Sequence, residues 1–236
     1  GVLLRRRAEE MTELADKTER ELRERTERLA GVVSVGAAET VAAELLVRAV
    51  DSFRKKYPEV TFELDAGIAD RIKERIDAGL LDLGLLIEPG DIAKYDFLRL
   101  GIDDRCGILM NAAAPLAQRE FVTAEDLVGL PVVGPAREGI RQFYRNGLGE
   151  AFDRLNFIAS FDLVNNAALF ARLNVGYVFT IEGTLRHYGS SELCFRPFCP
   201  ELRQSTFLVW KKYQPVSRAV RAFIDEVAML ARHDNA

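Results

Sequence analysis

Residues 32–87 alternate between strand and helix patterns, and this alternation limits the fold more than any other feature of the 236-residue chain. The apolar, β-branched run VVSVGA is typical of a buried parallel strand. Pro58 disfavours helix at Tyr57 and so ends the helical pattern before it. The successive predicted elements are a strand at 32–37, a helix at 39–56, a strand at 60–64, a helix at 69–78 and a strand at 81–87. This order implies right-handed crossovers and a parallel sheet.

The rest of the chain repeats the alternation. Its predicted elements are strands DFLRLGI and RCGILMN separated only by Asp103-Asp104, a short helix TAEDLVG, strand PVVG, a helix at 137–153, strand FIAS, a helix starting at an Asp162 cap, strands GYVFTI, LCFRPF and STFLVWKK, and a final amphipathic helix, VSRAVRAFIDEVAMLARH. The last strand and helix are apolar enough to return to the first half. We therefore predict two Rossmann-like α/β subdomains, 31–103 with 206–236 and 104–205, joined by a two-strand hinge. Small ligands favour the cleft that such a hinge creates.

Residues 1–30 form a different kind of segment, a long helix with heptad spacing. No glycine or proline occurs from residue 4 to residue 29, and a helix of that length reaches roughly 40 Å. Gly31 is expected to end it. We predict a linker and dimerisation helix, because so little apolar surface gains little without a partner; the alternative is a solvated helix with no partner. The apolar positions of the heptads are Leu4, Ala8, Met11, Ala15, Leu22 and Leu29.

Composition excludes several kinds of function. The net charge of −4 makes the chain a poor binder of nucleic acid by electrostatics alone. Two histidines, and an odd number of cysteines without zinc-like spacing, argue against a metal site and for a reducing, cytoplasmic setting. Cys194 and Cys199 are expected to be ordinary residues rather than a redox switch. No apolar run is long enough to span a membrane, and no signal peptide is recognisable. We find no nucleophile or acid–base cluster, so we expect neither an enzyme nor a cofactor.

Several ordered segments resemble the LysR-type transcriptional regulators over essentially the whole chain. The segments are GVLL followed by Ala8, then LAGVVSVGA, FRKKYPEVTFEL, AGLLDLGLLI, LNVGYVFTI and FLVWKK. The resemblance implies a type 2 periplasmic-binding-protein-like fold, preceded by a linker helix, in a cytoplasmic homo-dimer or tetramer. It also implies a small-molecule effector, no membrane contact, and operator DNA bound through a winged helix-turn-helix that would precede Gly1. The alternative is a solute-binding protein of a transport system, which shares the fold.

The first predicted effector-binding loop opens the helix that follows the first strand, and comprises Ala38, Glu39 and Thr40. Backbone N–H groups and the helix dipole at such an end favour an anion. Thr40 aligns with a hydroxyl residue that contacts effector in relatives; the alternative is a simple helix cap. Glu39 would repel an anion, which leaves room for a ligand with an amine or hydroxyl groups.

The remaining predicted effector-binding residues follow other strands. Arg137 can pair bidentately with a carboxylate, although a surface arginine is the alternative. Phe161 is either a cleft wall or core. The set comprises Ile68 and Ala69 in the second loop, Gly134, Pro135 and Arg137 in the third, and Phe161 and Thr180 at other strand ends.

Overall fold

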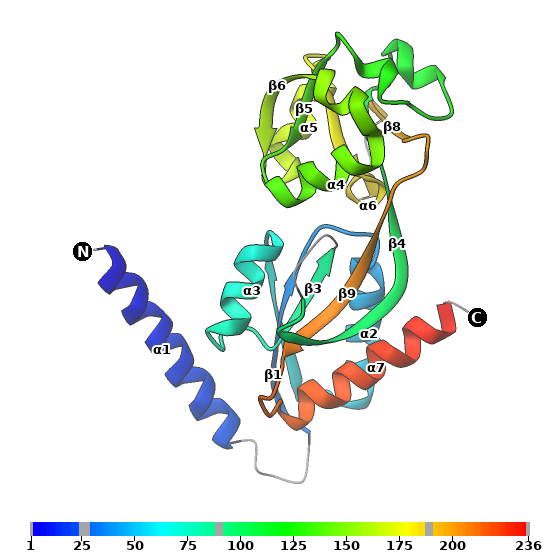
Figure 1. Ribbon diagram of the computed structural model, residues 1–236. Coiled ribbons are helices and arrows are strands. Elements are labelled where there is room, and N and C mark those ends of the chain that lie inside the picture. Colours follow the sequence, from blue (N-terminus) through cyan, green and yellow to red (C-terminus); the bar gives the residue numbers. More distant parts are fainter. Residues whose placement is uncertain (1, 24–28, 88–91, 187–190, 235–236) are drawn as a thin grey trace.

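The chain folds into two α/β subdomains that are stacked end to end and joined by two long strands (Figure 1). The computed structural model describes residues 2–23, 29–87, 92–186 and 191–234. Subdomain I is formed by the first part of the α/β region together with the last strand and helix, and subdomain II is inserted between these two parts. The predicted α/β fold with a two-strand hinge is confirmed.

Subdomain I consists of a sheet with helices on both sides. Strand β1 pairs in parallel with β2 and β3, as predicted. Phe53 and Phe223, with rings 5.4 Å apart, hold α2 against α7 in the main core, so the last helix does return to the first half. Its elements are β1 (Gly31–Ala37), α2 (Ala43–Lys56), β2 (Val60–Ala66), α3 (Ala69–Asp77), β3 (Leu83–Ile87) and α7 (Arg218–Asp234).

Subdomain II has the same plan with a more aromatic core. Strand β5 pairs in parallel with β6 and β7, and rings of Tyr144, Phe152 and Phe198 surround Phe179. Its elements are β5 (Pro131–Pro135), α4 (Glu138–Leu148), β6 (Asn156–Phe161), α5 (Val164–Arg172), β7 (Tyr177–Ile181), α6 (Glu182–Arg186) and β8 (Leu193–Pro197), with 3₁₀ turns at Pro115–Gln118, Glu125–Leu127 and Gly149–Arg154.

Two antiparallel strands, β4 (Tyr95–Asn111) and β9 (Arg203–Lys211), pass through both subdomains. Their register shifts between Arg99 and Asp103, where the sheet turns from one subdomain into the other. Two separate strands divided by Asp103-Asp104 were expected here, and that expectation is wrong: β4 is continuous and Asp104 is a paired, buried strand residue. The predicted subdomain boundaries, 103/104 and 205/206, lie one residue apart in this ladder, because Asp103 pairs with Ser205 and Asp104 with Gln204.

Three local expectations are corrected. Helix α2 begins at Ala43 rather than at residue 39, because residues 39–42 form bends and a turn instead. Helix α4 ends at Leu148 and continues as a 3₁₀ turn. Asp162 does not cap α5, whose N-cap residue is Leu163 without a side-chain hydrogen bond.

Helix α1 (Val2–Arg23) extends beside subdomain I (Figure 1). The side chains of Leu4, Ala8, Met11 and Ala15 are exposed, with Leu4 77% and Met11 72% accessible. Leu29 instead packs against the core of subdomain I. The Leu22 side chain and residues 24–28 of the expected helix lie outside the described residues, and Gly31 opens β1. None of the described helices is long and apolar enough to cross a membrane.

Candidate functional site

A cavity of about 130 Å³ lies between the two subdomains. It is walled by the ends of β1 and β3 and the start of α3 on one side, and by the starts of α4 and α5 and the end of β7 on the other. Small-molecule sites in α/β proteins form at this position, beyond the carboxyl ends of parallel strands. The lining residues are Ala38, Glu39, Gly67, Ile68, Ala69, Ile87, Pro135, Arg137, Ile140, Tyr144, Phe161, Asp162, Leu163, Val164, Phe179, Thr180, Ile181, Thr184 and Gln204.

The structure brings most of the predicted site residues together around this cavity. Thr40 and Gly134 are not part of the lining. Gly134 lies behind it, packed so closely on Phe157 that an added Cβ would be 2.4 Å from the ring. The predicted residues that do line the cavity are Ala38, Glu39, Ile68, Ala69, Pro135, Arg137, Phe161 and Thr180.

Thr40 takes part in a buried network on the hinge side of the cavity. Its hydroxyl donates to Asp104 Oδ2, and the N–H of Val41 donates to the same oxygen at 3.1 Å. The N–H of Gly183 donates to Asp104 Oδ1 at 2.9 Å. Burial raises the pKa of Asp104, although the bonds from Thr40, Gly183 and Val41 oppose this shift. One carboxyl group of the hinge strand thus ties the start of α2 in subdomain I to α6 in subdomain II.

Gly183 lets the two subdomains approach closely at this point. A Cβ added there would lie 2.3 Å from the backbone nitrogen of Val41 and 2.7 Å from Asp104 Oδ1. The Val41 nitrogen and the Thr40 carbonyl carbon, 2.7 Å away, are backbone atoms that cannot turn aside, so the contact requires glycine. Arg105, next to Asp104, adds a bidentate ion pair to Glu182 at 2.8 and 3.0 Å.

The opposite side of the cavity is closed by an ion pair between the subdomains. Arg137, at the start of α4, donates to both carboxylate oxygens of Asp70, in the first turn of α3, at 2.9 and 3.1 Å. The Asp70 side chain is 53% exposed. Its partial burial raises its pKa, but the hydrogen bond from Lys73 and the charge and hydrogen bonds of Arg137 outweigh this, so the pKa is lowered. The pair joins the two subdomains at the mouth of the cleft.

Polar groups inside the cavity are few and belong mainly to subdomain II and the hinge. The Thr180 hydroxyl donates to that of Thr184 at 3.1 Å. Nε2 of Gln204, a residue 4% exposed, is buried without a hydrogen-bond acceptor in the described part of the chain. Tyr144 donates to the carbonyl oxygen of Thr180, and burial raises its pKa well above the usual value. Burial likewise raises the pKa of the neighbouring Cys106 to about 12, so this thiol is un-ionised.

Sequence reasoning missed Asp104, Gly183 and Gln204. Asp104 was expected to lie between two predicted strands. One signal was available: Gln204-Ser205-Thr206 is a polar run that opens an otherwise apolar strand, and all three residues are buried. Buried polar groups in a strand need partners, which is a reason to place them at a site or a hinge.

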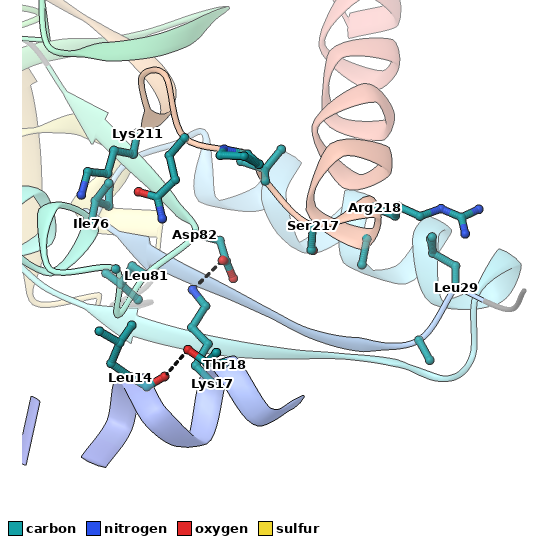
Figure 2. A pocket seen from close by; sticks show the side chains of 16 residues that line it. Leu14, Lys17, Thr18, Leu29, Ile76, Leu81, Asp82, Lys211, Ser217 and Arg218 are labelled. Atoms are coloured by element: carbon teal, nitrogen blue, oxygen red, sulfur yellow. Dashed lines mark hydrogen bonds and ion pairs between the residues drawn. The ribbon is translucent and has the colours of Figure 1, made fainter. Parts of the chain in front are cut away.

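A second cavity, of about 530 Å³, lies between α1, the start of β3 and the loop before α7. Figure 2 shows Lys17 reaching from α1 to Asp82, with a Nζ–Oδ1 distance of 2.6 Å. Both side chains are largely buried, 17% and 12% exposed, and Asp82 Oδ2 also accepts bonds from the N–H and hydroxyl of Ser34. Leu14 packs near Gly79, where an added Cβ would be 3.3 Å from it. These contacts fix α1 on subdomain I.

Metal-ligating side chains do not cluster in the part of the chain that the structure describes. It contains no group of three or more His, Cys, Asp or Glu side chains that could hold a metal ion. The three cysteines are free: Cys106 is buried, Cys194 half-buried and Cys199 exposed.

Two α/β subdomains, a two-strand hinge and a cavity at the subdomain interface define a bilobal ligand-binding domain. The family model of the LysR substrate binding domain matches residues 26–231, and the chain belongs to this family. Among solved structures, it resembles HinK, a LysR family transcriptional regulator from Pseudomonas aeruginosa, with a TM-score of 0.69 and 20% identity over 98% of this chain and 82% of that one. It also resembles the effector-binding domain of QuiR in complex with shikimate, with a TM-score of 0.72 and 17% identity over 87% of this chain and 99% of that one.

Curated relatives are also regulators. The activator HcaR of the Escherichia coli hca operon is 24% identical over 196 residues, 81% of this chain and 65% of that protein. YvbU of Bacillus subtilis, an HTH-type transcriptional regulator, is 25% identical over 103 residues, 44% of this chain and 34% of that protein. In these two matches the aligned part is between about a third and two thirds of the relative's length. The comparisons favour a regulator over a transport solute-binding protein.

Proposed function

We propose that this chain is the effector-sensing and oligomerisation part of a DNA-binding transcription regulator, and that the cavity between the subdomains holds the effector. The observation that carries the proposal is the cavity itself, in a LysR substrate binding domain. It lies between two bodies that a hinge allows to change their angle. A ligand that contacts both can therefore bias that angle.

The hinge and the mouth support this mechanism in different ways. The buried network around Asp104 holds the subdomains together at the hinge, whereas the mouth is joined by the partly exposed Asp70–Arg137 pair. Exposed ion pairs contribute little stability, so this one can open at low cost to admit a ligand and then re-form. QuiR, a structural neighbour, is recorded with shikimate, which supports a small-molecule effector here.

Helix α1 would convey the change to a DNA-binding module. The exposed apolar side chains on α1 include Leu4 and Met11, and pairing α1 with a second copy would cover them. The Lys17–Asp82 ion pair fixes α1 to subdomain I, so α1 moves with subdomain I when the angle between the subdomains changes. The proposal includes a homo-dimer or tetramer, operator DNA bound through a winged helix-turn-helix outside these residues, a cytoplasmic location and no catalysis.

The experiment uses the complete regulator and the 236-residue chain together. A thermal-shift screen of small acids, alcohols, amino acids and sugars on the chain identifies a stabilising compound. Thr180→Val, which removes a cavity hydroxyl, should weaken binding about tenfold, the cost of one lost hydrogen bond of about 1.4 kcal/mol. Thr61→Val, on the exposed strand β2, is the matched control and should bind normally.

The same compound should change the affinity of the complete regulator for its operator, measured by fluorescence anisotropy. Thr180→Val should need about tenfold more compound for the same response. A compound that binds Thr180→Val as tightly as the wild type, or a complete protein that binds no DNA, would contradict the proposal.

A further inference from the structure

We propose that the cavity between the subdomains takes a small uncharged molecule, with an apolar body and a hydrogen-bonding group, because the chain's own Asp104 already occupies the anion position at the start of α2. This inference rests on the proposed function, whose effector it describes. It is carried by the hydrogen bonds at the helix ends, the charges in the cavity wall and the uncharged polar groups of that wall.

The start of α2 is the place where an acidic ligand would ordinarily be held, because helix N-termini leave N–H donors unsatisfied. Here the donors have acceptors within the chain. The N–H of Val41 and the hydroxyl of Thr40 donate to Asp104. The N–H of Ala42 donates to Thr40 Oγ1, and those of Ala43 and Glu44 to backbone carbonyl oxygens. A second carboxylate at this helix end would find no donor among these groups.

The other helices that begin at the cavity carry their own acids as well. Asp70 lies in the first turn of α3, Glu138 in that of α4, and Asp162 directly before the N-cap of α5. Acidic side chains at these positions compensate the positive end of the helix dipole. An anionic ligand would therefore lose attraction at each helix end and would gain repulsion from Asp162, which lines the cavity.

The cationic side chain in the cavity wall is also engaged. Arg137 is the sole Lys or Arg among the lining residues described, and its Nε and Nη2 both donate to Asp70. Glu39 and Asp162 are the acidic side chains in the same wall. The formal charge of the lining residues is thus negative, one cation against two anions, before Asp70 is counted.

A charged amine fits poorly for a different reason. Most of the wall is apolar, with Phe161, Phe179 and Ile181 among its residues, and moving a charge into such surroundings costs free energy that a close partner must offset. Of the two acids in the wall, Glu39 already has an interaction within the chain, and Asp162 is exposed to solvent, where ion pairs contribute little. An uncharged hydroxyl or carbonyl group meets suitable partners instead. These are the Thr180–Thr184 hydroxyl pair and the Gln204 amide, whose Nε2 has no acceptor in the described structure.

Size completes the description. A volume of about 130 Å³ is of the order that admits a benzene-sized molecule. The ligand class is therefore a small alcohol, phenol, aldehyde or amide with a compact apolar body.

The first test compares three probes with one ring and different charge, namely benzyl alcohol, benzoate and benzylamine. Each is titrated into the 236-residue chain at pH 7 and constant ionic strength, with binding measured by two-dimensional NMR. Benzyl alcohol should shift resonances of the cavity residues, and benzoate and benzylamine should bind at least tenfold more weakly. Benzoate binding as tightly as benzyl alcohol, benzylamine binding more tightly than it, or no binding by any of the three, would overturn the inference.

The second test asks whether Asp104 holds the anion position. In Asp104→Ala the site is vacated, so added formate should raise the melting temperature of the variant by several degrees more than chloride at equal ionic strength. Formate should not stabilise the wild type, Asp104→Asn, which keeps the space filled, or Asp162→Ala, which removes an exposed carboxylate from the same cavity. Equal effects of formate and chloride on Asp104→Ala would contradict the assignment. If Asp104→Ala does not fold, a wild-type melting temperature that rises with formate would contradict it too.

These outcomes are distinct from a failure of the proposed function. A complete regulator whose operator binding responds to a carboxylate held in this cavity would overturn the ligand class and leave the function intact. A complete protein that binds no DNA would overturn the function, whichever of the three ring probes the cavity accepts.

Discussion

The two sides of the cavity are joined by carboxyl groups in opposite environments. At the hinge, Asp104 is fully buried and accepts bonds from a hydroxyl and two backbone N–H groups. At the mouth, Asp70 has a 53% exposed side chain and pairs with Arg137. Breaking the hinge contact leaves buried donors unsatisfied, whereas the groups at the mouth can bond to water instead. The difference supports the proposal of a clamp with a fixed hinge and a mouth that opens.

The pKa shifts of the two groups follow the same division. Burial raises the pKa of Asp104, so its charged form is tolerated rather than favoured. Partial burial of Asp70 is outweighed by Lys73 and Arg137, so its pKa is lowered. The mouth therefore depends on charge, and the hinge depends on hydrogen bonds and close packing.

The largest effect is expected from Gly183→Ala. The new Cβ would lie 2.3 Å from the Val41 nitrogen, so the hinge must separate, at a cost of about 3 kcal/mol in the free energy of unfolding. Urea denaturation measures it. Gly139→Ala in α4, whose Cβ would meet nothing within 4 Å, should stay within about 0.5 kcal/mol of the wild type. Equal stabilities would show that the hinge is not tightly packed.

Asp104→Asn should come next, at about 2 kcal/mol, because an amide cannot accept every bond that the carboxylate accepts. The loss should appear as a lower urea midpoint with an unchanged slope. Asp162→Asn, an exposed acid in the same cavity, should change the midpoint little. An Asp104→Asn variant as stable as the wild type would show that the hinge network does not stabilise the fold.

Lys17→Met tests whether burial, rather than charge alone, determines how much an ion pair stabilises the fold. The Lys17–Asp82 pair has a cation, as at the mouth, but its side chains are only 17% and 12% exposed. Breaking it should cost about 1 to 2 kcal/mol, because Asp82 retains its bonds from Ser34. Thermal unfolding against Lys55→Met, which breaks the exposed Asp51–Lys55 pair, measures the difference. Equal losses would mean that burial does not govern these pairs.

Asp70→Asn should cost less than about 1 kcal/mol, because the Asp70 side chain is more than half exposed. The main expected effect is a more mobile mouth. Trypsin should therefore cleave after Arg137 faster once its ion pair with Asp70 is lost. Asp51→Asn, another exposed acid in an ion pair, is the control and should leave this cleavage unchanged. A loss as large as that of Asp104→Asn would abolish the contrast between mouth and hinge.

The smallest expected effect is the pH dependence of the stability of Asp70→Asn and of Asp104→Asn, each relative to the wild type. The Asp70 pKa is lowered on folding, so its contribution is present above the ordinary value near 3.8 and is lost as pH falls through the folded value. The Asp104 pKa is raised, so its contribution is full below 3.8 and declines as pH rises through the folded value. From pH 7 to pH 3, the stability difference between wild type and Asp70→Asn should shrink, and that for Asp104→Asn should grow. Urea midpoints across this range test both signs.

Much of the architecture could be predicted because it depends on local patterns. Strand and helix periods, Pro58 and the polar loops place β1, α2 and β2 to within a few residues, and the loops that follow the strands supply most of the cavity lining. The hinge could not be predicted in the same way. The structural role of Asp104 depends on its contacts with Thr40 and Gly183, which are far away in the sequence. No local sequence pattern predicts such contacts. Thr40 was expected in the cavity wall for the same reason: the local sequence gives no sign that its hydroxyl donates to Asp104 in another strand.

The central claim is that a ligand in the cavity moves the mouth while the hinge stays fixed. Spin labels at Arg71→Cys in α3 and Gly139→Cys in α4, with Cys194 and Cys199 replaced by serine, report the distance across the mouth by pulsed electron resonance. Saturating benzyl alcohol should shift and narrow that distance distribution, and in Thr180→Val the shift should need about tenfold more ligand, as for one lost hydrogen bond. A distribution unchanged by ligand that NMR shows to be bound would contradict the claim.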